Sequence, residues 1–299
     1  MEEDFNTILD CLTSQTYELI VISIVGMGGI VKSTLARKVY DDSSIRHRFD
    51  TCAWVTVSEN YNERQVLLDV VSSIISDRTD ESNIKMSNGQ LAEIVYRGLK
   101  CRRFLVVIDD LWSTEALDHM RRMYNKSRII LTTRLKYVAD YASCPEFPPH
   151  NMSFLSFDDS WNLFNERLFQ EQPYPSKLEE IGKRIVQQCR GLPLSIVVIA
   201  GLLGKMDLSH DNWRKVEENL NSFFGTISEQ FRTILSMSYN RLSQHLKACF
   251  LYIGGFPEDI EISVPKLIRL WIGEQFVRAR RDKRLELVAE EYLEELIEV

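Results

Sequence analysis

The fold of this chain is decided by the stretch Val21-Ile22-Ser23-Ile24-Val25-Gly26-Met27-Gly28-Gly29-Ile30-Val31-Lys32-Ser33-Thr34. It begins with apolar residues typical of a buried strand, continues through a glycine-rich turn and ends where Lys-Ser opens a helix. Strand, glycine-rich loop and helix in this order form a phosphate-binding P-loop, because backbone N–H groups of the loop and of the helix N-terminus surround the phosphate oxygens. A purely structural strand-turn-helix is the alternative.

The P-loop pattern G-x-x-x-x-G-K-[ST] assigns a role to the polar residues of this stretch. The lysine of the pattern reaches the β- and γ-phosphates, and the hydroxyl that follows it binds Mg²⁺. Lys32 and Ser33 occupy these positions, and Gly26 is the first glycine of the pattern. The other loop glycines expected to line the phosphate site are Gly28 and Gly29.

Val31 departs from the pattern, because a second glycine is required at its position. Some positions of such a loop need backbone angles that only glycine adopts cheaply. A β-branched residue with a positive φ is a genuine outlier. We therefore expect Val31 to weaken nucleotide binding.

Three more β-rich stretches follow, at residues 52–58, 104–110 and 128–134, with helical patterns between them. Strands that alternate with helices predict a parallel sheet covered on both faces, and hence an α/β fold. Ligands bind such sheets at the carboxyl ends of the strands. Asp109 and Asp110 end one stretch and Arg134 ends another, so we expect them beside the P-loop.

These three charged residues suit phosphoryl chemistry. Asp109 is the candidate for holding Mg²⁺ beside the hydroxyl of Ser33, and Asp110 could orient or deprotonate an attacking water. Arg134 could contact the γ-phosphate. The alternatives are structural: the paired acids could cap the following turn, and Arg134 could form a surface ion pair.

The second half of the chain is expected to be helical. A proline-rich segment at residues 143–150 reads as a linker. The pattern Ser176-x-x-Glu179 predicts a capping box for the next helix. An apolar helix is predicted from residue 192 to 204, buried on all sides, and an amphipathic one over 285–297.

Composition limits the classes of protein. The chain has 299 residues, a formal net charge of −7 and six cysteines without metal-ligand spacing. The acidic balance argues against nucleic-acid binding, and the basic cluster at residues 278–284 reads as a solvated loop. No signal peptide or transmembrane segment is evident, so we expect a cytoplasmic protein with reduced thiols.

Six motifs occur in order along nearly the whole chain. They are GMGGIVKSTLA (26–36), FDTCAWVTVS (49–58), FLVVIDDLW (104–112), SRIILTTR (127–134), CRGLPLS (189–195) and CFLYIGGFPED (249–259). With them the chain resembles the NB-ARC nucleotide-binding domain of plant coiled-coil, leucine-rich-repeat (NLR) disease-resistance proteins, and most of all the late blight resistance protein homologues of nightshades.

The resemblance implies a P-loop domain at 1–148, a helical domain at 149–224 and a winged-helix domain at 225–299, with ADP or ATP and Mg²⁺ between them. It implies that Thr34 contacts phosphate or Mg²⁺ together with Lys32 and Ser33, and that Pro193 packs on adenine. It further implies a switch that ADP holds closed and that oligomerises with ATP to trigger defence, hydrolysing ATP slowly at most. The implied partners are a coiled coil and a repeat domain.

The chain also departs from the family. Besides Val31, the Met-His-Asp motif that closes the winged-helix domain is absent, and the loop after Trp112 is short. A truncated or decayed family member is therefore expected. A nucleotide-free interaction scaffold and a multi-turnover ATPase remain the alternative functions.

Overall fold

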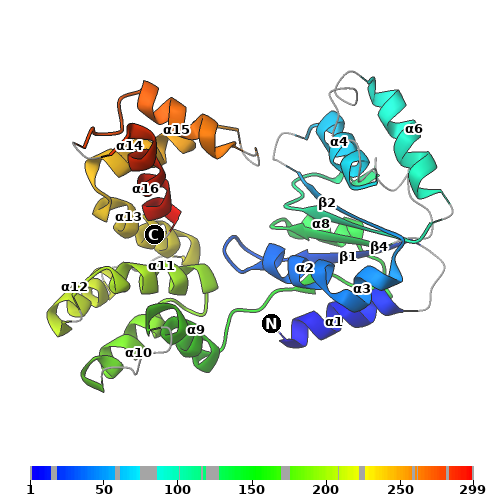
Figure 1. The fold of residues 1–299 in the computed structure, drawn as a ribbon. Coiled ribbons are helices and arrows are strands. Elements are labelled where there is room, and N and C mark those ends of the chain that lie inside the picture. Colours follow the sequence, from blue (N-terminus) through cyan, green and yellow to red (C-terminus); the bar gives the residue numbers. More distant parts are fainter. Residues whose placement is uncertain are drawn as a thin grey trace. The chain divides into compact units, whose positions relative to one another are not determined.

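The computed structural model describes residues 2–14, 19–57, 61–74, 86–100, 102–115, 117–118, 128–169, 176–207, 209–221, 226–257, 260, 262–280 and 283–297. The chain forms two compact units, Met1–Ser153 and Phe154–Val299. Each unit is described by itself (Figure 1).

The first unit is built on a parallel sheet of five strands. Their bounds are β1 Ile20–Val25, β2 Thr51–Thr56, β3 Phe104–Asp109, β4 Arg128–Thr133 and β5 His150–Asn151. The strand order is β2-β3-β4-β1-β5, so β1 lies between β4 and β5. All pairings are parallel, which brings the carboxyl ends of the strands to one edge. The predicted α/β fold is confirmed.

Helices cover both faces of this sheet, as Figure 1 shows. One face carries α1 (Glu2–Thr13), α2 (Lys32–Asp41) and α3 (Ser43–Arg48), and the other carries α4 (Glu63–Ile74), α6 (Asn88–Leu99) and α8 (Lys136–Ala142). Successive strand residues point to opposite faces. On β3, Val106 and Ile108 pack in one core while Leu105 and Val107 pack in the other. Because both faces of the sheet are covered, its strands require unbroken runs of apolar residues, as the sequence indicated.

The segment expected to be a linker, 143–150, belongs partly to the sheet. His150 begins β5 and pairs with Ile24 of β1, and Met152 donates its backbone N–H to the Val25 carbonyl at 2.8 Å. Residues 143–149 lie outside the named strands and precede the boundary of the first unit, so the linker prediction was wrong only at His150, because a two-residue strand leaves no periodic pattern. The division into three domains at 148 and 224 remains a prediction.

The second unit is helical in the residues described. Its helices are α9 Phe157–Phe169, α10 Glu179–Gln188 preceded by a 3₁₀ turn Ser176–Leu178, α11 Pro193–Gly204, α12 His210–Asn221, α13 Ile227–Arg241, α14 Gln244–Ile253, α15 Val264–Gly273 and α16 Leu285–Ile297. The apolar α11 was predicted to be buried on all sides; it is buried on most, and Leu194 is exposed. One core lies among α9 to α13, and a second lies among α14, α15 and α16.

The expected capping box at Ser176 and Glu179 does not form. Leu178 is the N-cap of α10 and makes no side-chain cap hydrogen bond. Ser176 lies in the preceding 3₁₀ turn, which places it two residues too early. Complete capping boxes occur instead at Ser87 of α6 and Thr226 of α13.

No described helix is both long enough and apolar enough to cross a membrane. The five cysteines that the structure describes are free thiols. Burial raises the pKa of Cys189 to about 12 and that of Cys249 to about 11, so both thiols are poor nucleophiles.

Candidate nucleotide-binding site

The loop between β1 and α2 has the course of a P-loop. β1 ends at Val25, and α2 begins at Lys32. Gly29 has φ 79°, a conformation that glycine adopts without strain. The first N–H groups of a helix lack an intrahelical partner and point toward any anion at its N-terminus. This end of α2 is therefore suited to bind phosphate.

Gly26 is required for a different reason. A β-carbon there would lie 2.9 Å from Cγ2 of Ile30 and 3.1 Å from Cβ of Met152. At Gly28 a β-carbon would meet only the Arg134 guanidinium, at 3.8 Å. Gly26 therefore allows close packing under the loop, while Gly28 lies where the loop faces Arg134.

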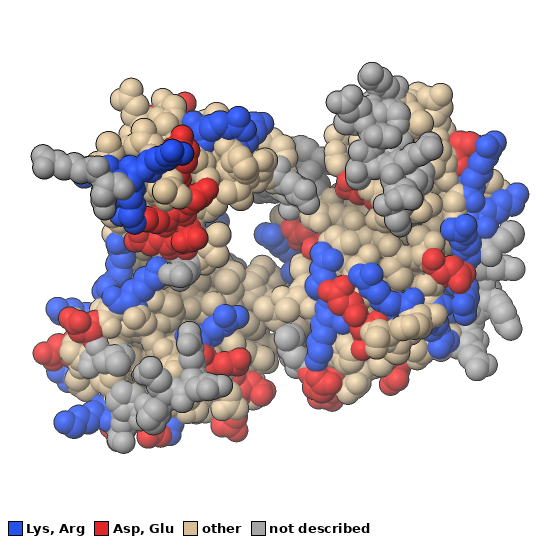
Figure 2. Space-filling view, in the orientation of Figure 1, with Lys and Arg blue, Asp and Glu red and all other residues tan. Residues whose placement is uncertain are grey.

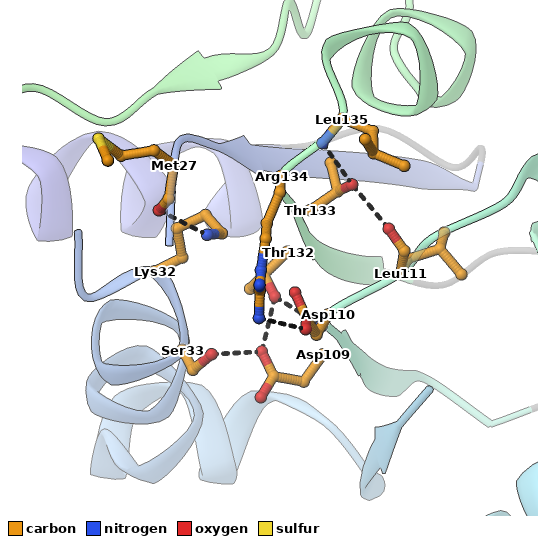
Figure 3. Close-up of polar contacts among 10 residues, drawn as sticks. All are labelled: Met27, Lys32, Ser33, Asp109, Asp110, Leu111, Thr132, Thr133, Arg134 and Leu135. Carbon is orange, nitrogen blue, oxygen red and sulfur yellow. Dashed lines mark hydrogen bonds and ion pairs between the residues drawn. The ribbon is translucent and has the colours of Figure 1, made fainter. Parts of the chain in front are cut away.

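Lys32 is almost fully buried, with 6% of its surface exposed. Its ammonium donates to the Met27 carbonyl at 3.1 Å, so the lysine folds back along its own loop (Figure 3). Burial lowers the pKa of Lys32, and the nearby carboxylates of Asp110 and Asp109 oppose that shift. Within the described part of the chain the Met27 carbonyl is the one hydrogen-bond acceptor of this ammonium, which leaves the ammonium available to a phosphate.

Ser33 and Asp109 meet as the sequence predicted. The Ser33 hydroxyl donates to Oδ1 of Asp109 at 2.7 Å. The same oxygen accepts a second hydroxyl proton, from Thr132, at 2.6 Å. Figure 3 shows the three side chains converging from α2, β3 and β4. A hydroxyl and a carboxylate side by side are oxygen ligands of the kind that Mg²⁺ prefers, so these residues fit the ion.

Asp110 and Arg134 form an ion pair beside this cluster. Nη2 of Arg134 donates to Oδ2 of Asp110 at 3.0 Å. The guanidinium also lies over the Trp112 ring, 5.0 Å from its centroid. Asp110 has φ 53°, the left-handed region that a non-glycine residue enters only when its surroundings hold it there. Arg134 therefore forms an ion pair, which was the structural alternative. It also lies beside the loop, where a contact with the γ-phosphate would require it.

Val31 adopts the conformation expected of the missing glycine. It is the residue before α2, with φ 64° and ψ 32°. A left-handed valine is strained, because its branched β-carbon crowds the backbone. The strained backbone that we expected at Val31 is therefore present, whereas the weakening of nucleotide binding stays a prediction.

The last two predicted residues are Thr34 and Pro193. Thr34 is exposed on the first turn of α2. Pro193 is the first residue of α11, buried in the second unit, so its contact with adenine stays a prediction. Sequence reasoning missed Thr132 and Trp112. Thr132 could have been noticed as a polar residue that faces inward at the end of an apolar strand.

Together the sheet, the loop and the converging side chains define the class of protein: a P-loop nucleotide-binding module. Comparison with solved structures agrees on the fold. A signal-transduction ATPase (STAND) protein of Pyrococcus horikoshii superposes with a TM-score of 0.52 at 13% identity, over 99% of this chain and 42% of that one. The Aeropyrum pernix ORC2 protein, solved with ADPNP and ADP, gives 0.50 at 15% identity, over 99% of this chain and 84% of that one.

Sequence comparison gives the family. Residues 1–173 match the NB-ARC domain, and residues 256–299 match the disease resistance protein winged helix domain. The chain belongs to the NB-ARC domain family. The late blight resistance protein homolog R1B-12 of Solanum demissum is 41% identical over 93% of this chain and 20% of its own length. The late blight resistance protein R1-A of the same species is 40% identical over 93% of this chain and 21% of its own length.

The expected resemblance is thereby confirmed. The chain spans about a fifth of the length of the curated relatives that it matches. It is a nucleotide-binding module of the disease-resistance class.

Proposed function

We propose that this chain is the ADP/ATP switch of a plant immune receptor that acts in defence against pathogens. The observation that carries the proposal is the convergence of Lys32, Ser33 and Asp109 at the N-terminus of α2. In full-length relatives the switch would work together with a coiled coil and a leucine-rich-repeat domain, oligomerise on activation and act in the cytoplasm.

The residues would divide the work as follows. The glycine-rich loop and the N–H groups of Lys32 to Thr34 would bind the phosphates, and the Lys32 ammonium would exchange the Met27 carbonyl for a phosphate oxygen. Ser33 and Asp109 would hold Mg²⁺, which when bound neutralises phosphate charge. Pro193 would pack on adenine.

Asp110 and Arg134 would distinguish the triphosphate from the diphosphate. Arg134 now pairs with Asp110, and a γ-phosphate would compete for the same guanidinium. Freed from that pair, Asp110 could orient or deprotonate a water. Because each step requires a partner exchange, we expect slow hydrolysis at most, serving to reset the switch.

The alternative function, a scaffold without nucleotide, is motivated by Val31. It predicts no nucleotide affinity at all. The switch predicts weak but measurable affinity, because Lys32, Ser33 and Asp109 all remain in place.

Isothermal titration of the purified chain with ADP and Mg²⁺ separates the two functions. We expect saturable 1:1 binding that Lys32→Met abolishes. Absence of heat at millimolar ADP, in both the native chain and Val31→Gly, would favour the scaffold. Equal binding by the native chain and Lys32→Met would place the nucleotide somewhere other than this loop.

A further inference from the structure

The side chain of Thr132 lies at the point where hydrogen bonding between β3 and β4 stops. The last paired residues of these strands are Ile108 and Leu131. Thr132 follows directly and is fully buried. It is not one of the P-loop residues, and the proposed function assigns it no part.

Thr132 contacts three successive residues after the end of the ladder. Its hydroxyl donates to Oδ1 of Asp109 at 2.6 Å and accepts the backbone N–H of Asp110 at 2.9 Å. Its backbone carbonyl accepts the N–H of Leu111 at 2.8 Å. The direction of both hydroxyl bonds is fixed, because an ionised carboxylate can only accept and a backbone N–H can only donate.

One hydroxyl therefore sets the position of both acids. It holds Asp109 Oδ1 on the side where the Ser33 hydroxyl also donates, 2.7 Å away. It also anchors the backbone of Asp110 in its left-handed conformation, from which the Asp110 carboxylate reaches Arg134. Figure 3 shows the Thr132 hydroxyl hydrogen-bonded to both acids. Residues that orient the ligands of a metal commonly contribute about tenfold or more to the affinity for the metal.

We propose that Thr132 is the positioning residue of this site, aligning Asp109 for Mg²⁺ and Asp110 for Arg134. The proposal rests on the proposed function for the identity of the ligand. It adds that the magnesium-dependent part of nucleotide affinity depends on a hydroxyl that touches neither nucleotide nor metal.

The neighbouring Thr133 provides a matched control. It too is fully buried in β4, and its hydroxyl also makes two hydrogen bonds, to the Leu111 carbonyl at 2.7 Å and from the Leu135 N–H at 3.1 Å. Neither partner is an acid. Thr132→Val and Thr133→Val therefore remove the same group from adjacent positions, and Thr132→Ser restores the hydroxyl.

The test measures ADP affinity with Mg²⁺ and with EDTA for the native chain and these three variants. Mg²⁺ should raise the ADP affinity of Thr132→Val about tenfold less than it raises that of the native chain. In EDTA the two affinities should be equal. Thr132→Ser and Thr133→Val should keep the gain. A full magnesium gain in Thr132→Val, or an equal loss in Thr133→Val, would overturn the proposal.

A second measurement needs no nucleotide. Hydrogen exchange at single-residue resolution should show the Asp110 amide exchanging at least tenfold faster in Thr132→Val than in Thr133→Val. If the native chain binds no ADP, the proposed function fails, and this comparison alone decides the role of Thr132. Equal exchange in the two variants would remove that role.

Discussion

Val31 combines a positive φ with a branched side chain immediately before the phosphate-binding lysine. Strain of this kind costs on the order of 1–3 kcal/mol. If the loop relaxes when empty, the cost appears as lost affinity; if the loop stays as it is, the cost appears as lost stability. We expect Val31→Gly to bind Mg-ADP roughly tenfold more tightly, since 1.4 kcal/mol corresponds to about a tenfold change in affinity.

Paired calorimetric titrations of the native chain and Val31→Gly measure this directly, with thermal unfolding of both as the companion. Unchanged affinity together with an unchanged unfolding midpoint would show that position 31 carries no strain.

Lys32 illustrates the cost of keeping a binding group buried. Its pKa is lowered chiefly by burial, so the folded chain disfavours the ammonium form. At a pH well below the lowered pKa the lysine is charged in both folded and unfolded states, and the penalty is present in full. It is relieved as the pH rises through the lowered pKa. We therefore expect Lys32→Met to lose Mg-ADP binding and yet unfold at a higher temperature than the native chain.

Thermal midpoints at neutral and alkaline pH check this expectation, and the difference between the two chains should shrink at alkaline pH. A variant less stable than the native chain at neutral pH would mean that the ammonium stabilises the empty loop.

Among individual residues, those with a fixed place in a motif could be predicted from the sequence. Lys32, Ser33 and Asp109 come together because the P-loop and the carboxyl end of β3 lie at the same edge of the sheet. Thr132 could have been noticed as a polar residue near the end of an apolar strand, but its role could not be predicted, because that role depends on where the ladder between β3 and β4 stops. The register of strands is not readable from unbroken apolar runs.

Gly191, between α10 and α11, joins two helices through a conformation that other residues cannot adopt cheaply. It has φ 72°, and a β-carbon there would lie 2.4 Å from the Leu155 carbonyl oxygen. Gly191 and Leu155 are also joined by a backbone hydrogen bond of 2.9 Å. We expect Gly191→Ala to lower the free energy of unfolding of the second unit by more than about 1 kcal/mol.

Gly273→Ala is the control, because among the described residues no atom beyond its chain neighbours and the backbone of its own helix lies within 4 Å of the added β-carbon. Urea unfolding followed by tryptophan fluorescence would compare the two variants with the native chain. Similar midpoints for Gly191→Ala and the native chain would contradict the account of this turn.

At the scale of elements, long periodic segments were predictable and short ones were not. The burial of α11 followed from its unbroken apolar composition. β5, with two residues, gave no pattern. The start of α10 was misplaced because Ser-x-x-Glu matches a capping box only when serine directly precedes the helix, and a 3₁₀ turn intervenes here.

The basic cluster predicted to be a solvated loop, residues 278–284, is described apart from Arg281 and Asp282. Arg280 pairs with Glu291 of α16 at 2.9 Å, and Lys283 pairs with the same carboxylate. Figure 2 shows acidic side chains gathered over α16 next to basic ones. Because Arg280 and Lys283 pair with a carboxylate of the acidic α16, and the whole chain carries −7, we expect no nucleic-acid binding.

A mobility-shift titration with duplex DNA near physiological ionic strength checks this. A salt-sensitive shift at micromolar protein would contradict it.

The central claim, that this chain binds nucleotide through the loop at residues 26–34, is tested most directly by hydrogen exchange with and without Mg-ADP. We expect protection in residues 26–34 and around Asp109 and Arg134, with α15 and α16 unchanged. Val31→Gly should reach the same protection at lower ADP concentration. Unchanged exchange across residues 26–34 at saturating Mg-ADP, in both chains, would contradict the account.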